Sequence, residues 1–219
     1  MKEAFEFLKN GGVVMIPIAL GSVIALAIFL ERMWSLRKSR IVPADLIQSV
    51  LELVKTNDFS KARDLCLTSN SPTGRILQAG IDARDAKRQD VKERFEETGR
   101  QEVARMERFI EAMGTTASVE PLLGLLGTVT GMIGVFKKVV KTADTGAVDP
   151  GQLAGGIWQA LITTAAGLSV AIIAYVGYRY LQSKSQRRVL EMEEGSMALL
   201  DLLHPAVAKP EQESRKDAK

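Results

Sequence analysis

Five polar side chains lie within otherwise apolar stretches of this sequence and are its main candidates for chemistry. They are the hydroxyls of Thr128, Thr163 and Thr164, the amide of Gln159 and the carboxyl of Glu120. Such groups can form a polar pathway when they line a cavity between membrane helices. The alternative, favoured on composition alone, is that each hydroxyl bonds a carbonyl four residues back in its own helix.

Glu120 is the only charged residue in three apolar windows, 13–30, 112–136 and 150–178. It directly precedes Pro121, towards the predicted cytoplasmic end of its helix. We interpret it as a carboxylate that reaches water among the headgroups; a role in proton relay is the alternative. Because the windows hold no other carboxylate, a proton relay across the membrane needs an acid from a partner.

The three windows are long enough to cross a hydrocarbon core of about 30 Å at about 1.5 Å per helical residue. The sequence therefore predicts an all-α membrane protein with three transmembrane helices, whose long helices extend into a cytoplasmic helical bundle. The expected segments are an outer-interface amphipathic segment at 1–12, transmembrane helix 1 at 13–32, a cytoplasmic helical region at 33–111, transmembrane helix 2 at 112–138, an outside loop at 139–149, transmembrane helix 3 at 150–181 and a cytoplasmic tail at 182–219.

Composition argues against a soluble enzyme, although a mean hydropathy of +0.04 taken alone resembles that of a soluble domain. The single cysteine, Cys66, allows no internal disulfide, and with one histidine, His204, no His/Cys metal site can form. We expect both to be packing or surface residues. The chain lacks a GxxxxGK[ST] phosphate-binding loop, so we expect neither a metal nor a cofactor. The balanced charges of the first twelve residues do not indicate a cleavable signal.

The basic residues near the span ends predict the orientation of the chain, because Lys and Arg collect on the cytoplasmic side. The predicted inner side carries Arg32, Arg37, Lys38, Arg40, Lys92, Arg94, Arg100, Arg105, Arg108, Arg179, Lys184, Arg187 and Arg188. The predicted outer side carries Lys2, Lys9, Lys137, Lys138 and Lys141. This imbalance places the N-terminus outside and the C-terminus in the cytoplasm.

Small residues recur along one face of the second span and one face of the third, mostly at intervals of three, four and seven. Such strips let another helix backbone approach closely. The glycines expected to pack are Gly124, Gly127, Gly131, Gly134, Gly156 and Gly167. Thr128, Thr164 and Gln159 lie on or near these strips, where a cavity between helices would form.

The charged segment between the first two windows shows helical periodicity. Ser71 followed by Pro72 predicts a helix start. From Asp90 onward one face stays apolar up to the second window, which predicts a helix that runs unbroken from the cytoplasm into the membrane. Packing in a local bundle is favoured over a coiled coil, because no heptad pattern is sustained.

Two motifs carry a family resemblance: ASVEPLLGLLGTVTGMI at 117–133 and LAGGIWQALITTAAGL at 153–168. They resemble the signature of the MotA/TolQ/ExbB proton-channel family. The pair Gly11-Gly12 and the sequence Leu-Glu-Arg at 30–32 are similar to the ExbB/TolQ branch.

The resemblance implies an inner-membrane subunit that forms a pentameric ring around the transmembrane helices of an ExbD/TolR-like single-span partner. Protons would pass an aspartate on the partner's helix, and the machine would energise a TonB- or TolA-like transducer. By motif, Thr128 and Thr164 would face the lumen. The sequence departs from the family at Gln159, where many relatives carry glutamate, and at Glu120 and Ile173, where alanine and proline are common.

Two functions from different classes follow. The leading hypothesis is a proton-conducting stator subunit, in which Thr128, Thr164, Thr163, Gln159 and Glu120 are the candidate pathway residues. The alternative is a non-conducting membrane scaffold that uses the same small-residue strips only for assembly. A substrate transporter is a weaker third hypothesis, because three spans without repeats give little material for alternating access.

Overall fold

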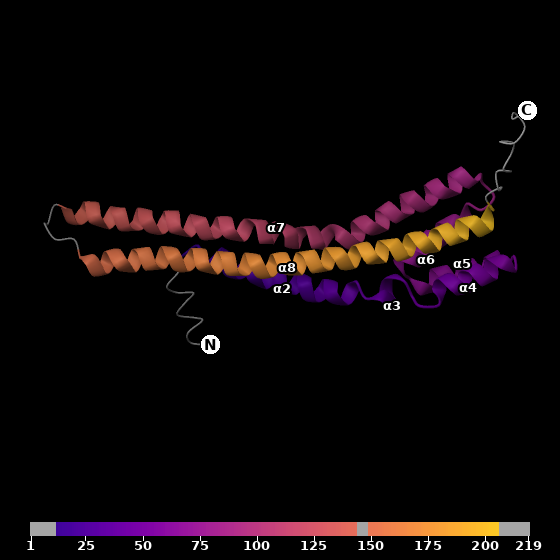
Figure 1. Cartoon of the computed structure of the whole chain (residues 1–219), viewed down its shortest axis with the longest axis horizontal. Helices are drawn as coiled ribbons and strands as arrows, with labels where there is room; N and C mark the ends of the chain where they lie inside the picture. Colours follow the sequence, from indigo (N-terminus) through magenta and orange to yellow (C-terminus); the bar gives the residue numbers. More distant parts are fainter. Residues whose placement is uncertain (1–11, 144–148, 206–219) are drawn as a thin grey trace, which may run out of the picture. The chain divides into compact units, whose positions relative to one another are not determined.

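A computed structural model describes residues 12–143 and 149–205 of the chain. The described residues form helices and no strand, which confirms the all-α prediction (Figure 1). The helices are α2 (Met15–Ser35), α3 (Lys38–Ile41), α4 (Leu46–Lys55), α5 (Phe59–Ser69), α6 (Pro72–Asp82), α7 (Arg88–Ala143) and α8 (Pro150–Leu203). The amphipathic segment predicted at 1–12 lies outside the described residues except for Gly12, and so does the end of the predicted tail, 206–219.

Three helices, α2, α7 and α8, are long and apolar enough to cross a membrane. Two of them contain a whole predicted window, and the third, which begins at Met15, covers the window 13–30 except for its first two residues. The unbroken helix predicted from Asp90 into the second window is confirmed, because α7 runs through Pro121 without ending. The chain divides into two compact units, one built from α2 with residues 106–185 and one from residues 37–105 with the chain after 185.

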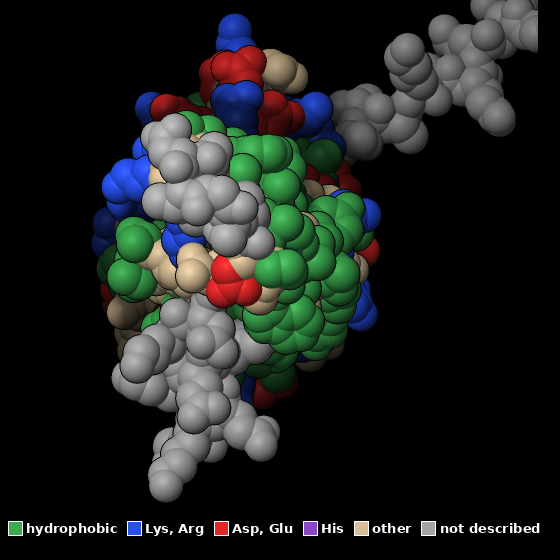
Figure 2. All heavy atoms as spheres, turned by 90° about the vertical axis from the view of Figure 1, so that its left-hand side faces the viewer, with side chains coloured by type: hydrophobic (Ala, Val, Ile, Leu, Met, Phe, Trp, Pro, Cys, Tyr) green, Lys and Arg blue, Asp and Glu red, His purple; other side chains and the backbone are tan. Residues whose placement is uncertain are grey.

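In the first unit, α2, α7 and α8 meet through small side chains. Ala25 of α2, Ala117 of α7 and Ala174 of α8 form one buried cluster. Large apolar side chains face outward instead; Leu122 is 62% exposed and Ile172 is 64% exposed. Figure 2 looks onto the end where α7 finishes and α8 begins, and hydrophobic side chains cover a broad area of it. An apolar surface of this extent suits contact with lipid or with other transmembrane helices.

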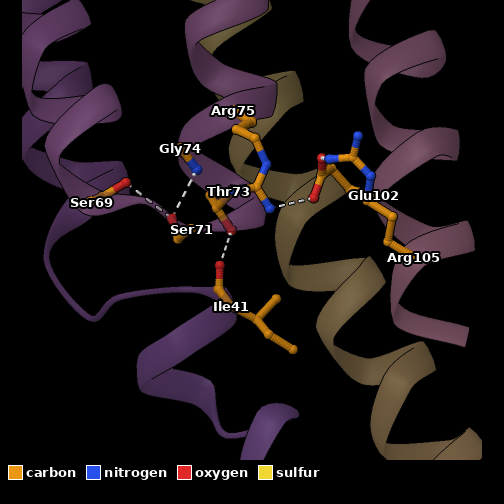
Figure 3. Close-up of polar contacts among 8 residues, drawn as sticks. All are labelled: Ile41, Ser69, Ser71, Thr73, Gly74, Arg75, Glu102 and Arg105. Carbon is orange, nitrogen blue, oxygen red and sulfur yellow. Dashed lines mark hydrogen bonds and ion pairs between the residues drawn. The ribbon is translucent and has the colours of Figure 1, made fainter. Parts of the chain in front are cut away.

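In the second unit, the predicted helix start at Ser71 is confirmed. The Ser71 hydroxyl accepts a hydrogen bond from the backbone N–H of Gly74 at 3.0 Å, and Pro72 occupies the first turn of α6. This cap satisfies a donor that the helix itself leaves unpaired. The buried Thr73 hydroxyl donates to the carbonyl of Ile41 at 2.6 Å and so ties α6 to the end of α3 (Figure 3).

A buried carboxylate joins α6 to the N-terminal part of α7. The Glu102 side chain is 4% exposed and accepts from Arg75 Nη2 at 2.5 Å and from Arg105 Nη1 at 2.8 Å (Figure 3). Arg75 belongs to α6, whereas Arg105 lies one turn after Glu102 on α7. The two guanidinium groups compensate the desolvation of this carboxylate.

We expect Glu102→Ala to lower the free energy of unfolding by about 1–3 kcal/mol, because the substitution leaves the partly buried Arg75 without its acceptor. Thermal unfolding of the full chain in detergent measures this change. The matched control is Glu96→Ala, which removes an exposed carboxylate of the same helix that pairs with Lys92 at 3.7 Å. An exposed pair contributes about 0–1 kcal/mol, so equal losses in both variants would contradict the structural role of Glu102.

Cys66 is buried in α5, as the packing interpretation predicts. Burial, with a smaller contribution from the negative charge of Asp82, raises the pKa of this thiol to about 11. Near neutral pH the sulfur is therefore the unreactive thiol rather than the nucleophilic thiolate.

Candidate functional site

The membrane parts of α7 and α8 run antiparallel and side by side, and glycine sets their separation (Figure 1). A Cβ atom placed at Gly167 of α8 would lie 2.6 Å from the carbonyl oxygen of Glu120 and 3.0 Å from Cα of Gly124. A Cβ atom at Gly124 would lie 3.1 Å from Cα of Thr164. The two backbones therefore touch, as the small-residue strips predict.

The other glycines of the strips differ in what they meet within the chain. Cβ atoms at Gly127 and Gly156 would collide with the side chains of Thr163 and Val135, and one at Gly131 would lie 3.0 Å from Cβ of Ala160. Gly134 does not pack in this way, because a Cβ atom there would meet open space. The regular spacing predicts a contact at Gly134 that the described residues of this single chain do not make.

One of the three candidate hydroxyls bonds across the helix contact. Thr164 Oγ1 donates to the carbonyl of Gly124 at 2.8 Å, which links α8 to α7. Thr163 Oγ1 donates to the carbonyl of Gln159 four residues back, and Thr128 Oγ1 to that of Leu125 three residues back. The prediction that each hydroxyl bonds the carbonyl four residues back in its own helix is thus correct for Thr163 and wrong for Thr164. Thr128 also bonds within its own helix, but to the carbonyl three residues back.

Gln159 lies beside the residue that precedes the first span. Its side chain is half-buried, and a Cβ atom at Gly12 would collide with Gln159 Nε2. Gly12 has φ +74°, a left-handed conformation that glycine adopts without strain. The backbone angle favours glycine at this position, and the amide at the end of the flexible Gln159 side chain occupies the space beside it.

The interpretation of Glu120 as a headgroup-facing carboxylate is wrong. Glu120 is 2% exposed, and its Oε1 faces Gly21 of α2, where a Cβ atom would collide with it. The reason is its helical position: Glu120 follows the buried Ala117 by three residues and precedes the buried Gly124 by four. Those intervals place it on the buried face of α7 rather than at the lipid surface.

The structure brings the candidate residues together in two places. At the contact of α7 with α8, Thr164 meets the backbone of Gly124, and the carbonyl of Glu120 one turn earlier on α7 lies beside Gly167. Thr128 lies one turn after Gly124 on α7. Gln159 and Thr163 are joined on α8 by a hydrogen bond. Each of the three hydroxyls donates to a backbone carbonyl, and a hydroxyl oxygen can still accept a hydrogen bond.

Two features of the structure were not predicted from the sequence. Gly21 of α2 was not predicted to pack, although a lone glycine within an apolar span is a signal for close approach. An apolar groove of about 710 Å³ also runs between α2 and α8, lined by residues that include Leu26, Phe29, Ile173 and Tyr180. No short motif encodes such a groove, because its walls come from distant parts of the chain.

Fold and site together define an all-α membrane protein whose three long apolar helices pack through glycine and one hydroxyl bond. The chain belongs to the MotA/TolQ/ExbB proton channel family, whose family model matches residues 68–194. This confirms the resemblance read from the motifs at 117–133 and 153–168, and the relatives support the ExbB branch.

Several relatives carry ExbB names. A protein of Synechocystis described as ExbB-like 1 is 37% identical over 185 residues, 84% of this chain and 72% of its own length. An ExbB homolog of Methanothermobacter thermautotrophicus is 30% identical over 86% of this chain and 66% of its own length. The biopolymer transport protein ExbB of Pseudomonas putida is 29% identical over 76% of this chain and 51% of its own length.

Proposed function

We propose that this chain is an ExbB/TolQ-like stator subunit of the bacterial inner membrane that takes part in proton conduction. With an ExbD/TolR-like partner, it couples the proton-motive force to work on an envelope-spanning TonB- or TolA-like transducer. The observation that carries the proposal is the hydroxyl bond from Thr164 to the Gly124 carbonyl, which lies within the family's two motifs. The excess of inner-side Lys and Arg supports a periplasmic N-terminus and a cytoplasmic C-terminus.

In this proposal several copies of the chain, five by family resemblance, form a ring around the partner's helix. The broad outward-facing apolar surface supports such assembly, because a single copy buries only 22–33% of each span window. The partner supplies an aspartate to the lumen. Within the three apolar windows of this chain the only carboxyl is Glu120, and it faces α2.

The proposed pathway residues have different roles. Thr164 and Thr128 would face the lumen and contact water near the partner's aspartate, while Thr163 and Gln159 would hold the outer part of α8 in register. Gln159 cannot titrate near neutral pH, so it would position water rather than carry a proton. Glu120 would influence the pathway from the α2 side.

Co-expression with a single-span partner tests the assembly. We expect the full chain to co-purify with a protein whose membrane helix carries an aspartate, and native mass spectrometry to find several copies of this chain in each complex. The matched control is co-expression with an unrelated single-span protein whose membrane helix carries no aspartate. A chain that purifies only as a monomer, or that binds both proteins equally, would contradict the proposal.

The alternative function is a non-conducting scaffold. It is favoured by the hydroxyls of Thr128 and Thr163, which bond carbonyls of their own helices and so leave less capacity for water. A scaffold predicts no proton flux in vesicles even when the partner is present. Flux that depends on the partner's acid would exclude it.

A further inference from the structure

The carboxyl group of Glu120 lies among three membrane helices and is incompletely satisfied there. The residue is 2% exposed, and Oε2 is buried without a hydrogen-bond partner among the described residues. Oε1 faces Gly21 of α2 at a distance that leaves no room for a Cβ atom. On the α8 side, Gly167 packs against the backbone carbonyl of Glu120. Few buried polar atoms in a folded protein lack a partner, so this one calls for an explanation.

The groups around Glu120 offer no compensating charge. The described contacts bring Gly21 from α2, Gly167 from α8 and Thr116 from α7 to this position, and the Thr116 hydroxyl already donates to the carbonyl of Ala112. The three apolar windows of the sequence contain no other charged residue. A buried ionised carboxylate without a counter-ion is strongly disfavoured, whereas a proton makes the group neutral.

We propose that Glu120 is a proton-binding site at the contact of α2, α7 and α8, and that proton exchange there is linked to the packing of α2 through Gly21. The carboxylate takes up one proton to form the neutral acid while α2 is packed against it. Release returns the proton to water and leaves a negative charge that requires water or a cation beside Gly21. Proton loss is therefore favoured when α2 separates from α7. This inference rests on the α2–α7 contact and does not require proton conduction along α8.

Infrared spectroscopy tests the proton site directly. The full chain is placed in vesicles of phosphatidylethanolamine and phosphatidylglycerol, and spectra are recorded over a pH series for the unmodified chain and for Glu120→Gln. We expect a carbonyl band of a protonated carboxyl that is absent from Glu120→Gln. It should fall about tenfold per pH unit above its midpoint, as a single titrating group requires. Spectra of the two proteins that coincide at every pH would overturn the proposal.

Two further variants control this measurement. Glu111→Gln removes an exposed carboxylate of the same helix, outside the apolar windows, and should leave the band unchanged. Gly21→Ala places a methyl group where Oε1 lies and should move the midpoint by at least about one pH unit, a tenfold change in proton affinity. Gly134→Ala adds the same methyl group in open space and should have no effect. Equal midpoints in Gly21→Ala and the unmodified chain would overturn the link to α2.

The infrared test of Glu120 can fail independently of the flux test of the proposed function. Loss of proton flux in a Thr164 variant with a normal Glu120 band would support conduction and leave the Glu120 site in place. A missing band in the unmodified chain overturns only the proton site at Glu120.

Discussion

In the proposed stator complex, replacing Thr164 with valine is expected to lower proton flux strongly while the complex still assembles. Valine keeps the shape of the side chain but removes the hydroxyl that donates to the Gly124 carbonyl at 2.8 Å. Hydrogen bonds between membrane helices contribute on average about 0.6 kcal/mol, which is too little to prevent assembly. Proton flux should fall about 100-fold, the lower end of the range for a positioned group that takes part in proton transfer.

Two matched variants separate the hydroxyl of Thr164 from its packing. Thr164→Ser restores a hydroxyl without the methyl group and should recover most of the flux. Thr163→Val removes a neighbouring hydroxyl that bonds the Gln159 carbonyl of its own helix, and it should have the smaller effect. The amount of complex recovered from the membrane is measured for each variant. Normal flux in Thr164→Val would remove Thr164 from the pathway.

The second large effect is expected at Gly167, where leucine should separate α7 from α8. Its Cβ atom alone would lie 2.6 Å from the carbonyl oxygen of Glu120 and 3.0 Å from Cα of Gly124. These are backbone atoms, which cannot swing aside as a flexible side chain can. We therefore expect Gly167→Leu to lower the free energy of unfolding by at least about 3 kcal/mol, the upper part of the usual range for overpacking.

Thermal unfolding of the purified chain in detergent measures the effect of Gly167→Leu. Gly155→Leu is the control on the same helix, because a Cβ atom at Gly155 has no neighbour within 4 Å. The free energy of unfolding of Gly155→Leu should differ from that of the unmodified chain by no more than about 0.5 kcal/mol, as is usual for surface substitutions. A Gly167→Leu protein as stable as the Gly155→Leu protein would show that the close helix contact is not required.

Much of this fold follows from sequence patterns that act over one or two helical turns. Uncharged windows require helices in lipid, because a lipid-exposed backbone must satisfy its own hydrogen bonds. The Ser71-Pro72 pair fixed the start of α6, since both residues favour that position for local reasons. The small-residue strips likewise predicted that α7 and α8 would touch, and Gly124 and Gly167 do so.

The errors concern which neighbour a side chain meets. The spacing that placed Gly134 on the strip is the same as that of Gly131, but no described part of the chain lies beside Gly134. Glu120 was assigned to the interface because of its charge, whereas its helical position buries it against Gly21. For Thr164, a hydroxyl can reach its own helix or the next one with equal ease. Such choices depend on contacts between distant segments, which short-range patterns do not encode.

The most direct test of the account is proton flux into vesicles that contain the full chain together with the proposed single-span partner. A pH-sensitive dye inside the vesicles reports the flux after a membrane potential is applied. We predict flux only when both proteins are present, and its loss when the partner's membrane aspartate is changed to asparagine or when Thr164 is changed to valine. Flux that is absent from the unmodified complex, or that persists in both variants, would contradict the assignment of this chain as a proton-conducting stator subunit.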